Sequence, residues 1–150
     1  MNDRAAHLRK LGGHPHGQAL SILARARVEH MTALAESLID RLGPIEVIHS
    51  RTGLVMLPMT DTVQGTDFHL GEVLVAEAQI SAEGAKGYGM VSGRDLEQAM
   101  AMAVIDVAGA RGLAEPEITA LLDSEAAHQA ATDASTLRAI AATRVEMETF

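Results

Sequence analysis

The 150-residue sequence contains no cysteine and no tryptophan, and only one tyrosine and two phenylalanines. Without cysteine, the chain can form no disulfide, no thiolate ligand for zinc or an iron–sulfur cluster, and no cysteine nucleophile. Three aromatic residues are too few for a surface that stacks on nucleobases or sugars. The composition therefore excludes several common kinds of binding and catalytic site.

Basic residues are also scarce, since 12 Lys and Arg stand against 20 Asp and Glu, a net charge of −8. Nucleic-acid-binding proteins need a basic surface, so we expect no nucleic-acid partner. No uncharged apolar run is long enough to cross a membrane, and the N-terminus has no signal-peptide core. We expect a soluble, cytoplasmic protein with no membrane partner.

The chain length and the distribution of glycine predict the domain organisation. A chain of 15.8 kDa can bury about two-thirds of its surface, which suffices for one domain with an apolar core. Residues 1–17 contain Gly12, Gly13, Pro15 and Gly17, which interrupt any regular pattern. We therefore expect a flexible leader over residues 1–17 and a single domain over residues 18–150.

Two helices are expected before the first strand. One begins near Gln18, and the second runs from Val28 to Leu42. In the second, Met31, Leu34 and Leu38 recur at helical spacing. Gly43 and Pro44 follow directly, and this pair is typical of a helix end.

The middle of the chain predicts strands. We expect strands over 45–49, 53–60 and 68–80, followed by a turn over 81–84 and a returning strand over 86–91. The segment 53–60 is apolar on both faces, which is typical of a strand covered on both sides. Pro58 lacks a backbone N–H, so this strand should lie at an edge or carry a bulge.

Helical spacing returns after Val91. Ser92 and Asp95 resemble a capping box at the start of a helix that Gly112 ends. Pro116 suits the first turn of the next helix, and Asp133 is a candidate cap for a last helix over 134–147. Strands grouped between helices predict an α+β fold, an antiparallel sheet packed against N-terminal and C-terminal helices.

Two histidines, His14 and His16, invite comparison with a metal site. A zinc site needs three or four ligands in a fixed geometry, and neighbouring glycines favour a flexible segment instead. The remaining histidines show no ligand spacing. We predict no metal site, and keep a metal-dependent hydrolase that uses His14, His16 and Asp61 as an alternative.

Two glycine-containing segments invite comparison with phosphate sites. The run 84–89 lacks the order of a P-loop and is better explained as a hairpin turn. The helix start at 92–95 offers free backbone N–H groups and Arg94, although Asp95 opposes an anion. An anion-binding module at this helix start is a second alternative.

Acidic and methionine residues show no catalytic pattern. Asp61, Asp67 and Glu72 lie near expected turns, where carboxylates are usually hydrated, and no G-x-S-x-G nucleophile motif occurs. Five methionines lie on apolar segments and suit either a core or a surface for a partner subunit: Met56, Met59, Met90, Met100 and Met102. We predict no catalytic residue.

Several short motifs, taken in order, resemble the PhnG subunit of the bacterial carbon–phosphorus lyase system. The resemblance covers about residues 18–149, and each motif is weak alone. The motifs are Leu20–Ala24, Thr52–Val55, Gly87–Asp95, Ala103–Asp106 and Thr143–Glu146. Residues 1–17, and a segment between Leu113 and Ala134, depart from the family pattern.

The resemblance implies a place in a complex. Proteins of this family assemble with PhnH, PhnI and PhnJ, and act with PhnL in displacing adenine from ATP by a phosphonate such as methylphosphonate. The product is α-D-ribose 1-methylphosphonate 5-triphosphate. The resemblance implies ATP as a substrate of the complex, no cofactor bound by this chain, and no catalytic residue within it. Self-association of the isolated chain is a further expectation.

Four charged residues are candidates for contact with a partner or ligand: Arg51, Arg94, Asp95 and Arg144. Arg94 and Asp95 belong to the most specific motif of the resemblance, and Arg144 belongs to its C-terminal motif. We expect the methionine and aliphatic surface to be covered by a partner, and the segment 144–150 to reach a neighbouring subunit.

Overall fold

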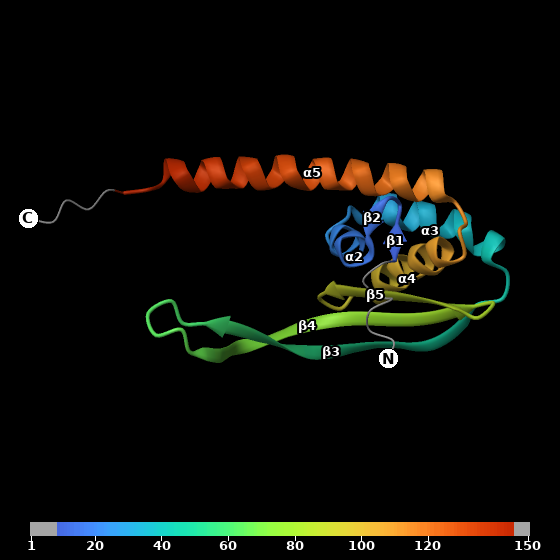
Figure 1. Cartoon of the computed structure of the whole chain (residues 1–150), viewed down its shortest axis with the longest axis horizontal. Helices are drawn as coiled ribbons and strands as arrows, with labels where there is room; N and C mark the ends of the chain where they lie inside the picture. Colours follow the sequence, from blue (N-terminus) through green and yellow to red (C-terminus); the bar gives the residue numbers. More distant parts are fainter. Residues whose placement is uncertain (1–8, 146–150) are drawn as a thin grey trace, which may run out of the picture.

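The computed structural model describes residues 9–145 and confirms the expected α+β class. A three-stranded antiparallel sheet forms one layer, helices α2, α3 and α4 lie on one of its faces, and α5 crosses on the far side of these helices (Figure 1). The elements are β1 (Lys10–Leu11), β2 (His14–Pro15), α2 (His16–Ala24), α3 (Val28–Leu42), β3 (Glu46–Thr60), β4 (Asp67–Ala82), β5 (Ala85–Ser92), α4 (Leu96–Ala110) and α5 (Glu115–Ala142). No helix within residues 9–145 is long and apolar enough to cross a membrane.

The three-stranded sheet has the order β3-β4-β5, so consecutive strands pair. The two strands expected over 45–49 and 53–60 form one strand, β3, with a register shift between Val47 and His49. A second shift falls between Leu57 and Pro58, on an edge strand. The prediction for Pro58 is thereby confirmed, because proline cannot donate to a ladder and is tolerated at edges and bulges.

Helix α4 packs closely on β4 and β5 because the facing residues are small. Gly87 and Gly89 of β5 lie against the α4 backbone at Ala103 and Ala99. Ala76, Ala78 and Ile80 of β4 are fully buried on the same sheet face, as period-two alternation requires. Helix α4 is buried almost all round, because the sheet covers one side and other helices cover the other.

The expected flexible leader is wrong from Arg9 onward. Lys10–Leu11 and His14–Pro15 form a two-residue hairpin whose loop, Gly12 and Gly13, has positive φ at both positions. Glycine adopts positive φ without a steric penalty, so two glycines can form a tight hairpin loop as well as a flexible segment. Leu11 is then buried, at 1% exposed, so the segment belongs to the core. Residues 1–8 lie outside the described residues.

Two predictions for the later helices are also wrong. Asp95, not Ser92, caps α4, because its side chain accepts a hydrogen bond from the Gln98 N–H at 2.9 Å. Asp133 caps no helix, since α5 continues from Glu115 to Ala142. The alanine-rich sequence between the two expected helices favours helix throughout. The part of the last expected helix beyond 145 lies outside the described residues.

Two arms project from the region where the helices pack on the sheet, and both lie on the same side of the molecule (Figure 1). One is the distal half of the β3–β4 hairpin, and the other is the distal half of α5. Every residue of β3 from Ser50 to Thr60 is exposed, as is every residue of α5 from 130 to 142. The expectation that 53–60 is covered on both faces is therefore not met within the described chain.

Candidate functional site

The exposed arms carry large apolar side chains that nothing in the described chain covers. In the hairpin, Leu54 is 62% exposed and Leu70 is 59% exposed. On α5, Leu137 and Ile140 are 65% and 60% exposed. Scattered apolar side chains are normal on a surface, but a contiguous group usually marks an interaction site. The hairpin group comprises Leu54, Val55, Met56, Leu57, Met59, Phe68, Leu70 and Val73.

The hairpin can hold its shape because of its backbone and its loop. Fourteen residue pairs join β3 and β4, from Glu46–Ser81 to Thr60–Asp67. At the loop, the Asp61 carboxylate accepts hydrogen bonds from the N–H groups of Val63 and Gln64, both at 3.0 Å. Asp61 is therefore a turn-forming residue, as short acidic side chains often are.

The outer sheet face carries a polar cluster that includes Arg51. The Arg51 Nε donates to Glu77 Oε1 at 2.6 Å, and the Tyr88 hydroxyl donates to Glu77 Oε2 at 2.8 Å. Hydrogen bonds from Arg51 and Tyr88 hold the pKa of Glu77 below its usual range. Burial and the bond to Glu77 raise the pKa of Tyr88 to about 12. Near pH 7 the cluster therefore consists of the Glu77 carboxylate and two hydrogen-bond donors, the Arg51 guanidinium and the Tyr88 hydroxyl.

His49 lies beside this cluster. Its Nε2 is 3.6 Å from Glu77 Oε1, too long for a hydrogen bond, and this buried atom has no hydrogen-bond partner among the described residues. A hollow of about 340 Å³ lies nearby on the outer face, with Arg51, Glu77 and Met90 in its lining. The cluster neutralises its own charges, so it presents no free charge for an anionic ligand.

A second polar centre ties the N-terminal segment to α4. Asp106 is 1% exposed. Its carboxylate accepts from Arg9 Nη2 at 2.9 Å and the Tyr88 N–H at 2.9 Å, and lies 2.8 Å from His16 Nε2. A buried carboxylate needs such partners to offset its lost hydration. All of these contacts are internal, so Asp106 serves the fold.

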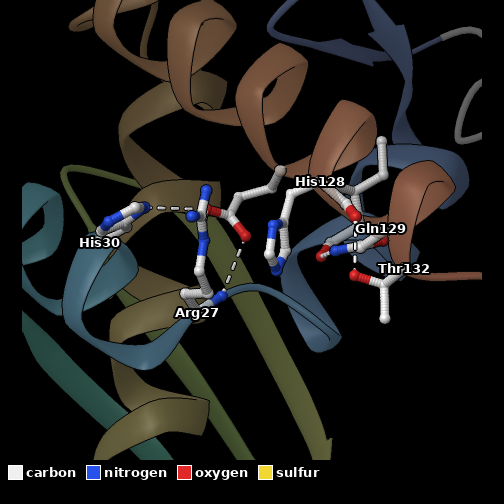
Figure 2. Close-up of polar contacts among 7 residues, drawn as sticks. Arg27, His30, His128, Gln129 and Thr132 are labelled. Carbon is white, nitrogen blue, oxygen red and sulfur yellow. Dashed lines mark hydrogen bonds and ion pairs between the residues drawn. The ribbon is translucent and has the colours of Figure 1, made fainter. Parts of the chain in front are cut away.

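A third polar centre anchors α5 through Glu125, which is 0% exposed. Its carboxylate accepts from the backbone N–H and the Nε of Arg27, both at 3.0 Å, and lies 2.9 Å from His30 Nδ1. Burial alone would raise the pKa of Glu125, but the hydrogen bonds from Arg27 and His30 outweigh it and lower the pKa. Figure 2 shows Arg27 and His30 opposite the turns of α5 that carry His128, Gln129 and Thr132.

The contacts of α5 continue with Gln129 and Asp133. The Gln129 amide donates to the Ile22 carbonyl at 2.9 Å, and Arg25 donates to Asp133 at 2.7 Å. Glu125, Gln129 and Asp133 are four residues apart, so they lie on one face of the helix. Beyond Asp133, the described part of α5 has no contact of this kind with the rest of the chain, and the exposed arm begins.

The four predicted contact residues do not form one site. Arg51 is on β3, Arg94 and Asp95 are in the connection before α4, and Arg144 follows α5. Within residues 9–145 no hydrogen bond or ion pair joins them to one another. All four are exposed, so their roles in partner or ligand contact stay predictions.

The alternative metal site is not assembled. His14 Nε2 lies 2.9 Å from an Asp123 oxygen, whereas His16 binds Asp106. Among residues 9–145, no group of three His, Asp or Glu side chains could hold a metal ion. The alternative of an anion-binding module at the start of α4 also loses support. The Gln98 N–H, which an anion would need there, already donates to the Asp95 carboxylate.

Sequence reasoning missed three carboxylate centres, the partly exposed Glu77 and the buried Asp106 and Glu125. One signal was present for Asp106, which interrupts the apolar run from Ala103 to Ala108. A charged residue within a buried helix requires partners, so the run predicts a buried ion pair. The partners are up to 97 positions away in sequence, and no local pattern could identify them.

Similarity to known proteins identifies the family of this chain. The sequence model of the family described as "Phosphonate metabolism protein PhnG" matches residues 15–150. The chain is 28% identical over 151 residues to the alpha-D-ribose 1-methylphosphonate 5-triphosphate synthase subunit PhnG of Rhizobium meliloti (strain 1021). That alignment covers 100% of this chain and 97% of the relative. This chain therefore belongs to the PhnG family of phosphonate metabolism proteins.

Proposed function

We propose that this chain is a subunit of a multi-subunit synthase that makes α-D-ribose 1-methylphosphonate 5-triphosphate. Family membership and the name of the R. meliloti relative support this role. The observation that carries it is the pair of exposed apolar arms, because permanent hetero-complexes bury large apolar surfaces. Apart from His49 Nε2, which has no hydrogen-bond partner among the described residues, the polar clusters of the described chain are internally satisfied or self-neutralising. This suits a subunit that supplies shape and contact surface.

The reaction proposed for the complex is a displacement at the ribose of ATP. The C1′–N bond to adenine breaks, and a phosphonate oxygen forms a new bond to C1′, so adenine leaves and the 5′-triphosphate is kept. In this proposal ATP and methylphosphonate are substrates of the complex, and PhnH, PhnI and PhnJ are the partners, with PhnL required for the transfer step. This chain contributes no reacting group and binds no cofactor.

The test is a shortened hairpin. Gly53 and Val75 are paired in the ladder, so an Asn-Gly turn that replaces residues 54–74 closes the two strands without the distal arm. We expect the shortened chain to fold, because the replaced segment includes no residue of the buried core. On co-expression, the full chain should copurify with PhnH, PhnI and PhnJ from the same organism, and the shortened chain should not.

Two results would contradict the proposal. One is copurification of the shortened chain at the level of the full chain. The other is turnover of ATP with methylphosphonate by the isolated chain alone. We also expect the isolated full chain to self-associate, and co-expression with its partners to keep it soluble, which size-exclusion chromatography measures.

A further inference from the structure

The outer edge of β3 is unpaired along its whole length in the described chain. β3 has 15 residues, and within residues 9–145 it pairs only with β4. An edge strand presents a row of unused N–H and C=O groups, and proteins usually keep such edges short, bulged or covered. Val47, Ile48 and Leu54 are all exposed on this strand, at 52%, 44% and 62%.

Hydrogen-bond alternation identifies which residues of β3 face outward. The Gly93 N–H donates to the Leu74 carbonyl at 2.9 Å, so the polar groups of Leu74 point toward β5. Directions alternate along a strand, so Val75 points toward β3 and bonds its partner Gly53. It follows that the backbone groups of Thr52 and Leu54 point outward, to the free edge.

Pro58 supports the same assignment. It lies four residues after Leu54, on the outward-facing set, where the missing N–H costs the ladder with β4 nothing. It also limits the edge, because no neighbouring strand can take a hydrogen bond from it. The part of β3 that can pair continuously with an added strand therefore runs from His49 to Leu57, between the two register shifts.

A groove lies beside this edge on the helix side of the sheet. It has a volume of about 460 Å³, and its lining includes Ala35 and Ile39 of α3, Met100 and Val104 of α4, and Ser50 of β3. The groove exists because α4 packs mainly on β5 and β4 and makes few contacts with β3. A strand added to β3 would thus place every second side chain toward an apolar groove.

The groove also carries negative charge. Glu36 of α3 and Glu97 of α4 line it, and both are exposed. Neither forms an ion pair within the described residues. An apolar pocket between two carboxylates complements an apolar side chain with lysine or arginine close to it.

We propose that the β3 edge and this groove bind one extended segment of a partner protein by strand addition. The segment pairs with the backbone of residues 49–57, places an apolar anchor in the groove, and carries lysine or arginine beside the anchor. Strand addition derives affinity from main-chain hydrogen bonds and specificity from pockets for alternate side chains. The proposal rests on the proposed function, because it states how a subunit of the assembly is held.

A second copy of this chain is the less suitable occupant. Each copy carries a net charge of −8, and association of two such copies brings like charges together. Moreover, the one arginine on β3 of a second copy, Arg51, is already bound to its own Glu77. A partner with a basic segment removes both difficulties.

The probes are overlapping 12-residue peptides that cover the PhnH, PhnI and PhnJ sequences of the same organism, with binding measured by fluorescence anisotropy. We expect at least one peptide with an apolar anchor beside a basic residue to bind. N-methylation of alternate residues on its pairing edge should abolish binding. Hydrogen exchange measured by NMR should show new protection at the amides of Thr52 and Leu54, and little change at Gly53.

Matched variants at Leu54 separate the contribution of its backbone N–H to peptide binding from the contribution of its side chain. Leu54→Pro removes an outward N–H and should weaken peptide binding at least about 10-fold, whereas Leu54→Ala keeps the N–H and should weaken it less. Reversal of both groove charges, E36K with E97K, should weaken binding about 5-fold. Circular dichroism and the melting temperature verify that each variant is folded.

Several outcomes would overturn the inference. They are binding by none of the peptides, protection that omits Thr52 and Leu54, or a self-association that Leu54→Pro abolishes while no peptide binds. If the folded Leu54→Pro chain copurifies with its partners like the wild type, strand addition is wrong and the proposed function stands. If the wild-type chain neither copurifies with partners nor binds a peptide, both are wrong.

Discussion

The proximal and distal halves of the same two elements differ sharply. On β4, Ala78 and Ile80 are 0% exposed, but Leu70, nearer the hairpin loop, is 59% exposed. On α5, Ile118 and Leu122 are 0% exposed, whereas Ile140 is 60% exposed. One half of each element is stabilised from within the chain, and the other half has apolar side chains with no cover. In the proposed function, the distal halves complete their packing against other subunits of an assembly.

The two arms stay regular without cover for different reasons. The distal part of α5 is rich in alanine, the best helix former, and its proximal part is held by Glu125 and Gln129. The distal hairpin depends on its backbone ladder and on the Asp61 turn. Neither reason requires buried apolar surface, so both arms can present apolar side chains to a partner.

The largest expected effect tests the proximal half. A Cβ at Gly89 would collide with the backbone of α4 at Ala99, so Gly89→Ala should cost about 3 kcal/mol of unfolding free energy. The melting temperature should fall by roughly 10 °C. Thermal and urea unfolding measure both quantities.

The control for this change is Gly53→Ala in the distal half. A Cβ at Gly53 meets nothing within 4 Å, so the expected change is within about 0.5 kcal/mol. Equal losses at the two glycines would contradict the division of the sheet into a packed half and an uncovered half.

A smaller effect is expected where the packed half of α5 ends. Glu125→Gln removes the charge that Arg27 and His30 face, and should cost about 2 kcal/mol at pH 7. Because the folded protein lowers the pKa of Glu125 below its ordinary 4.5, this stabilisation is present above that value and is lost as the pH falls through the lowered pKa. The difference between wild type and variant should therefore shrink as the pH is lowered from 7 to below 4.5.

Urea unfolding at both pH values measures the effect. The control is Glu117→Gln, which removes an exposed ion pair with Arg41 at 3.5 Å and should change stability by at most about 0.5 kcal/mol. A Glu125→Gln difference that grows in acid would show that this carboxylate is not held ionised by its partners.

The smallest effect on stability is expected on the distal half of α5. Leu137 and Ile140 are largely exposed, so their joint replacement by glutamine should change the unfolding free energy by at most about 0.5 kcal/mol. The same double variant should copurify poorly with its partners, weakened about 10-fold or more by the loss of two apolar contacts. Arg138→Gln on the same stretch is the control.

Much of the fold follows from local patterns. The helix over 28–42 was predicted with the bounds that the structure has, because its apolar spacing and its Gly43–Pro44 end are both local signals. The β4–β5 hairpin and the edge position of Pro58 followed in the same way. The hairpin at Lys10–Pro15 did not, because its glycines suit a flexible segment and a tight turn equally well, and only the burial of Leu11 distinguishes the two.

The candidate site was less predictable than the fold. Arg51 was selected from the sequence, but its partner Glu77 is 26 positions away on a neighbouring strand. The sequence shows that residues 53–60 are apolar, and this pattern predicts a strand that is covered on both faces. The structure shows instead that the described chain supplies no cover.

By itself, the sequence determined the α+β class, the order of most elements and, through a series of weak motifs, the family, because each depends on spacing between near neighbours. Only the tertiary structure decided that the N-terminal segment is part of the core, that Asp106 and Glu125 are buried ionic centres, and which apolar residues remain uncovered. These depend on contacts between distant residues, and burial is a property of the whole packed chain rather than of any local pattern.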